Sequence, residues 1–127
     1  MVHIYFYYGK NSELRRFYAE GHSRHRTGSL EYRILKLLGK KPSSSDIVCA
    51  AVSALLYTLV LGLDKVLKVN LKLEIKENGF LDCTIKSQSP QKKEKIDIIV
   101  DTVKKGLEEI KKEYSSEIEI TEVKNGT

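Results

Sequence analysis

The stretch IVCAAVSALLYTLVLGL, residues 47–63, decides how the rest of the chain is arranged. Apolar side chains lie on nearly every side of it, interrupted only by Ser53, Thr58 and Gly62. A helix of this kind has to be surrounded by protein, although its length borders on that of a membrane span. It begins among polar residues that can cap it, Ser45 or Asp46, in an otherwise amphipathic chain. We therefore expect a buried central helix and no membrane partner.

Strand patterns flank this helix on both sides. Residues 2–8 alternate between apolar and polar positions, and turn residues 9–12 lead to a weaker alternation that ends near Glu20. These two segments predict a hairpin. Residues 66–76 alternate most clearly, and Asn78-Gly79 is a signal for a type I′ hairpin that returns through 80–86.

The end of the chain completes the predicted fold. Pro90 marks the start of a long amphipathic helix that runs to about Tyr114, and residues 117–123 follow as a last strand. The order ββαββαβ predicts a single α+β domain over residues 1–127, with an antiparallel sheet.

The positive charge is concentrated in one segment. The net charge is +5. Between residues 23 and 45 there are six basic residues and one acidic residue, Glu31. These basic residues are Arg24, Arg26, Arg33, Lys36, Lys40 and Lys41. We predict a lid-like insertion at about 23–45 that carries one short amphipathic helix. Its charge is typical either of a solvated surface or of a contact with an anionic partner.

The beginning of the chain and its cysteine content indicate a compartment. Met1 is followed by an alternating run without a basic n-region, so we expect no secretory signal. Cys49 and Cys83 alone form neither a disulfide framework nor a zinc pattern. We expect a cytoplasmic protein with reduced thiols, no metal and no cofactor.

Cys49 is the candidate nucleophile. With Asp46 as N-cap it is the third residue of the helix, where free N–H groups and the helix dipole favour a thiolate. The same free N–H groups, including that of Cys49, would stabilise an oxyanion. A small core side chain is the alternative, and Cys83, on the inward parity of a strand, is expected to be core.

A base for this thiol has to come from histidine, which titrates near neutral pH. His22 follows Gly21 directly after a strand, whereas His25 lies among arginines that disfavour its protonated form. Chemistry favours His22 without excluding His25. Asp46 would orient the histidine or merely cap the helix, and Ser53, one turn after Cys49, would bond within the site or to its own helix.

Two segments resemble a known family. The Gly21-His22 pair and the run DIVCAAVS, residues 46–53, are similar to the Gly-His and Asp-[Ile/Val]-Val-Cys-Ala motifs of the ribosomal-processing cysteine protease Prp family. The resemblance implies a homodimeric cytoplasmic endopeptidase that removes the N-terminal extension of ribosomal protein twenty-seven of the large subunit. It implies that Cys49 is the nucleophile and His22 the proton carrier, with Asp46 and Ser53 in support. Arg24, Arg26, Arg33 and Lys36 would then be lid residues that contact the substrate.

A different class of function also fits the basic insertion. A ribosome- or RNA-associated protein without catalysis would use the same positive charge to bind phosphate. The chain has no RNA-binding motif that would favour this alternative. For the enzyme, ribosomal RNA would be a transient contact during processing.

Overall fold

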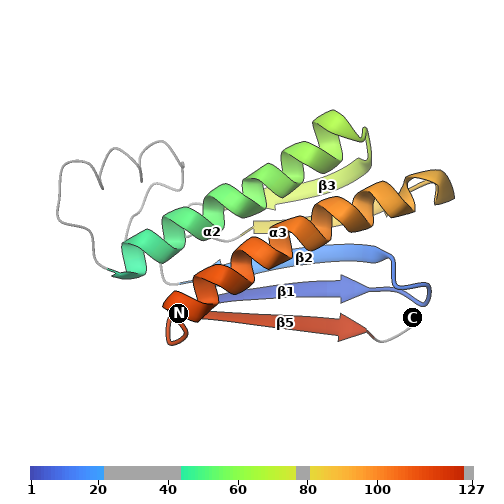
Figure 1. Cartoon of the computed structure of the whole chain (residues 1–127). Helices are drawn as coiled ribbons and strands as arrows, with labels where there is room; N and C mark the ends of the chain where they lie inside the picture. Colours follow the sequence, from blue (N-terminus) through green and yellow to red (C-terminus); the bar gives the residue numbers. More distant parts are fainter. Residues whose placement is uncertain (22–43, 77–80, 125–127) are drawn as a thin grey trace.

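Five strands and two long helices form the described part of the chain, residues 1–21, 44–76 and 81–124 of this computed structural model (Figure 1). The order is β1 (Val2–Tyr8), β2 (Leu14–Gly21), α2 (Ser44–Leu61), the π-helical turn η1 (Gly62–Val66), β3 (Asn70–Ile75), β4 (Leu81–Ser87), the 3-10 turn η2 (Pro90–Lys92), α3 (Lys93–Glu113) and β5 (Ile118–Lys124). The predicted α+β class and the ββαββαβ order are confirmed.

The strands form one sheet in the order β3-β4-β2-β1-β5. Three of its ladders are antiparallel, but β5 runs parallel to β1. The prediction of an antiparallel sheet is therefore wrong for the last strand. The long helix α3 returns the chain to the end of the sheet at which β4 began, so β5 has to run in the direction of β4, which is also the direction of β1.

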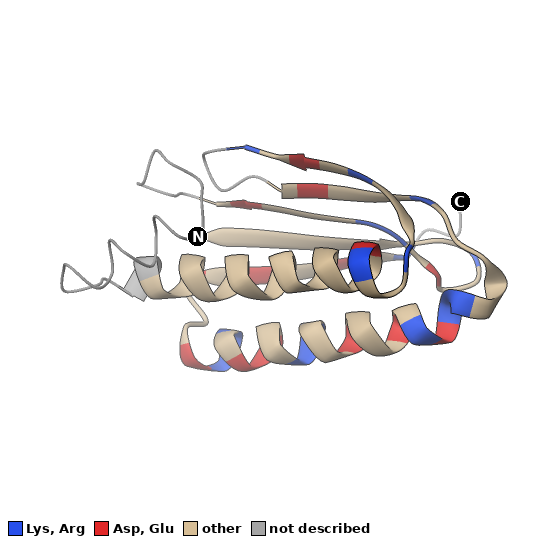
Figure 2. Ribbon diagram, turned by 90° about the horizontal axis from the view of Figure 1, so that it is seen from above, with Lys and Arg blue, Asp and Glu red and all other residues tan. Residues whose placement is uncertain are grey.

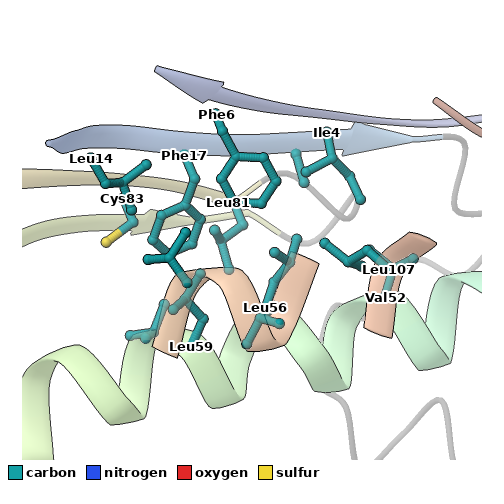
Figure 3. Close-up of a cluster of buried hydrophobic side chains, with 14 of the residues drawn as sticks. Ile4, Phe6, Leu14, Phe17, Val52, Leu56, Leu59, Leu81, Cys83 and Leu107 are labelled. Atoms are coloured by element: carbon teal, nitrogen blue, oxygen red, sulfur yellow. The ribbon is translucent and has the colours of Figure 1, made fainter. Parts of the chain in front are cut away.

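Both helices cover the same face of the sheet, as the two views show (Figures 1 and 2). Inward-facing residues of the central strands meet them. Phe6 and Phe17 are opposite each other in the β1–β2 register and fully buried, with ring centroids 6.2 Å apart. The labelled core side chains in Figure 3 are Ile4, Phe6, Leu14, Phe17, Leu81 and Cys83 from the strands and Val52, Leu56, Leu59 and Leu107 from the helices.

The two helices approach each other closely at Gly106 of α3. A Cβ atom on Gly106 of α3 would lie 3.2 Å from Cδ1 of Leu55 on α2. This contact identifies the side of α2 that faces α3. The helices also differ in charge, since α3 carries acidic and basic residues along its length and α2 carries almost none before Asp64 (Figure 2).

Several element boundaries differ from the prediction. The helix α2 begins at Ser44, and η1 extends it to Val66, where the Leu67 N–H donates to the Gly62 carbonyl at 2.9 Å. A positive φ of 56° at Lys68 then redirects the chain, so β3 begins only at Asn70. The predicted turn at Asn78-Gly79 and the predicted helix within the basic insertion lie outside the described residues.

Residues Ile47–Val66 are long and apolar enough, with a mean hydropathy of 2.1, to cross a membrane by length and composition alone. In this fold one side of the segment packs into the core. Its buried residues are Val48, Val52, Leu56, Leu59, Val60 and Leu63. Packing on the sheet accounts for these six residues. Other large apolar residues of the same segment, Ile47, Tyr57, Leu61 and Val66, are exposed, so the prediction of a helix surrounded by protein is confirmed for one side only.

Candidate active site

Cys49 lies beside the buried side of α2 and is itself only partly covered. Its neighbours Val48 and Val52 are 1% and 3% exposed, whereas Cys49 is partly exposed and packs against the core. A reactive cysteine needs both a fixed position and some exposure, and the residue Cys49 combines contact with the core and partial exposure.

The start of α2 changes the predicted role of the backbone. Counted from Ser44, Asp46 is the third residue of the helix and Cys49 the sixth, so Asp46 is not the N-cap. Only the first four N–H groups of a helix lack partners within it. The prediction that the Cys49 amide stabilises an oxyanion is therefore wrong. Helical side chains lean toward the N-terminus, so the thiol still lies toward the free amides of the first turn.

The second cysteine is in a different environment. Cys83 on β4 is fully buried, and this burial raises the pKa of its thiol to about 12. Because the ordinary value is 9.0, the folded protein keeps Cys83 protonated where the unfolded chain would lose the proton. Cys83 is the core residue that its parity on the strand predicts.

Ser53 accompanies Cys49 on the same side of α2. It follows by one turn and is also partly exposed. Leu55, which faces α3, is about 200° further around the helix than Ser53. Cys49 and Ser53 therefore lie on the side of α2 away from α3, toward the β3 edge of the sheet.

The strand that leads to His22 ends next to β1. Gly21 is the last residue of β2 and pairs with Val2, and a Cβ atom on Gly21 would lie only 3.2 Å from the Val2 Cα. A side chain at this position would press on the neighbouring backbone, so the close approach of two strands favours glycine here, which the sequence did not indicate. The end of β2 and the start of α2 lie at the same end of the domain in both views (Figures 1 and 2).

The remaining predicted site residues are not described by the structure. His22, His25 and the proposed lid residues Arg24, Arg26, Arg33 and Lys36 lie outside the described ranges, and the described side chains of α2 begin at Ile47, after Asp46. Among the described residues, no group of three or more His, Cys, Asp or Glu side chains could hold a metal ion.

Alkylation of the native protein should distinguish the two thiols. We expect iodoacetamide to modify Cys49 at least about a hundredfold faster than Cys83, because Cys83 is reached only when the fold opens. Peptide mapping after timed quenching measures both rates. In urea the rates should converge, and equal labelling of both cysteines in the folded protein would contradict the assignment of Cys83 to the core.

A partly exposed cysteine near a helix start, at the same end of the domain as a strand that the sequence continues into histidine, is compatible with a thiol-dependent hydrolase. The family model described as cysteine protease Prp matches residues 1–119. The chain is thus a cysteine protease. More narrowly, it belongs to the Prp family.

Solved structures share the fold. SMU.848 from Streptococcus mutans gives a TM-score of 0.72 at 20% identity, over 98% of this chain and 96% of that one. The essential ribosomal processing protease Prp from S. aureus, in complex with a substrate peptide, gives 0.70 at 17% identity, over 96% of this chain and 99% of that one. The S. aureus protease with a covalently linked product peptide gives 0.69 at 17% identity and the same coverage. No curated protein matches the chain.

Proposed function

We propose that this cysteine protease is a cytoplasmic endopeptidase that removes the N-terminal extension of a large-subunit ribosomal protein of the twenty-seven type during ribosome assembly. The observation that carries the proposal is the partly exposed Cys49 on α2, set against a buried and protonated Cys83. The family membership and the peptide-bound S. aureus protease support a peptide as substrate.

In the proposed reaction Cys49 forms a covalent acyl intermediate. Its thiolate attacks the scissile carbonyl carbon after His22 has taken the thiol proton. The C–N bond breaks, and the histidine gives this proton to the leaving amine. Water then hydrolyses the thioester, with His22 as base, and restores the thiol. The positive end of α2 would stabilise the thiolate and the oxyanion through amides that precede Cys49.

Other residues have supporting roles in the proposal. Asp46 would hold His22 in the productive orientation, and Ser53, on the Cys49 side of α2, would complete the polar site. Arg24, Arg26, Arg33 and Lys36 would form a basic lid that meets acidic substrate residues or, transiently, ribosomal RNA. The functional unit would be a homodimer.

The direct test is incubation with the ribosomal protein precursor from the same genome. We expect one cut near its N-terminus, seen by mass spectrometry as two fragments that sum to the precursor plus one water. The His22→Ala variant should lose this cut, whereas His25→Ala should keep it. An intact precursor after prolonged incubation would refute the proposed substrate, and loss of the cut in His25→Ala alone would reassign the base.

A further inference from the structure

The strand β3 is a free edge of the sheet. It pairs with β4 on one side, and among the described residues no strand pairs with its other side. Five of its six residues are exposed, and Leu71 is partly buried. An edge of this kind presents unpaired N–H and C=O groups that can accept another strand.

Apolar side chains lie uncovered along this edge on the helix side of the sheet. Leu73 and Ile75 are opposite Cys83 and Leu81, which are buried under the helices, so they point to the same face. Even so, Leu73 is 42% exposed and Ile75 is 48% exposed. The described helices therefore do not cover the apolar face of the sheet as far as its β3 edge.

The other edge of the sheet is protected, and β3 is not. On β5, Glu122 places a carboxylate on the helix side of the sheet. Its Oε1 forms an ion pair with Nζ of Lys104 on α3 at 3.0 Å. Charges that point inward at an edge prevent the addition of another strand. The strand β3 has no charge on its helix side and no proline. Its edge therefore lacks two of the features that block pairing.

The sequence of β3 is complementary to itself in one antiparallel register. With Leu73 opposite Leu73 of a second copy, Lys72 falls opposite Glu74 on both sides of the twofold axis, and Leu71 falls opposite Ile75. A shift of two residues places Lys72 opposite Lys72, or Glu74 opposite Glu74. A shift of one places Leu73 opposite a charged residue and turns the helices to opposite faces. Only the register centred on Leu73 pairs every charge with its opposite.

From this complementarity we propose that two copies of the chain pair along β3, antiparallel and centred on Leu73, to form one continuous sheet with all helices on one face. This inference names the surface of the homodimer in the proposed function and does not depend on protease activity. The partner that pairs with the edge of β3 is thus a second copy of the chain and not a peptide ligand.

Charge-swapped variants test the register directly. We expect sedimentation and native mass spectrometry to show a wild-type dimer whose dissociation constant rises roughly tenfold or more in Lys72→Glu and in Glu74→Lys, because each change creates two like-charge pairs. An equimolar mixture of the two variants should form a heterodimer of wild-type affinity, and the double variant should form a homodimer again. The effects should shrink in high salt.

The outcomes of this test bear separately on the surface, on the register and on the dimer itself. The matched control is Lys105→Glu on α3, whose side chain is 81% exposed, and it should leave the dissociation constant unchanged. If neither β3 variant changed the dissociation constant, the proposed surface would be wrong, although the dimer would exist. If both single variants weakened the dimer but their mixture did not restore wild-type affinity, the proposed register would be wrong. A wild-type monomer up to about 1 mM would overturn both, whatever the protease assay gives.

Discussion

Replacement of Cys49 by alanine is expected to abolish cleavage of the precursor, with kcat/KM reduced more than about a thousandfold. Alanine removes the sulfur that forms the acyl bond, and among the described residues the other thiol, Cys83, is buried and protonated. The backbone of α2 should be unaffected, since alanine is the best helix former. The measurement is the initial rate of precursor cleavage at several substrate concentrations.

The control for this prediction is Cys83→Ala. It removes one buried atom from the core and should cost about 1 kcal/mol of stability, while the activity of each folded molecule stays near that of the wild type. Cleavage that survives in Cys49→Ala but disappears in Cys83→Ala would exchange the roles of the two cysteines and refute the site.

Phe17→Ala should produce the largest loss of stability in the described part of the chain, about 3–5 kcal/mol. Its ring is fully buried under the helices and packs near Phe6 in the centre of the sheet (Figure 3). Unfolding in urea measures the loss, and Tm should fall by more than about 10 °C. Since β2 also leads to the site, unfolding of the variant should remove activity. Activity should therefore fall at temperatures near the new Tm.

An exposed strand position provides the comparison. Lys86→Ala on β4 changes an exposed side chain at the same sheet and should alter stability by no more than about 0.5 kcal/mol. If Phe17→Ala cost no more than this variant, the central packing described for the sheet and helices would be wrong.

The sequence predicted those elements whose own side chains determine them. The alternation in β1 and the apolar stripe of α3 gave nearly correct boundaries, since one face of each element is buried. The direction of β5 could not be predicted in this way, because it depends on where α3 returns the chain. The start of α2 was displaced because Ser44, Ser45 and Asp46 are all good capping residues, and local preference does not choose among them.

The candidate site was predictable only in part. The helix position made Cys49 plausible, and the DIVCAAVS run distinguished it from a core cysteine. The partial exposure that the proposed reaction of Cys49 needs depends on packing against the sheet, which no local pattern encodes. The preference for glycine at position 21 was missed for the same reason, because it comes from the approach of Val2 on another strand.

Detection of the acyl intermediate tests the central claim most directly. The wild-type protein is mixed with the precursor, quenched in acid within the first turnovers, digested and mapped by mass spectrometry. We predict a thioester that joins the N-terminal fragment of the precursor to the peptide containing Cys49, with the mass of the extension minus one water. Cleavage without any adduct on Cys49, together with undiminished cleavage by Cys49→Ala, would contradict the account.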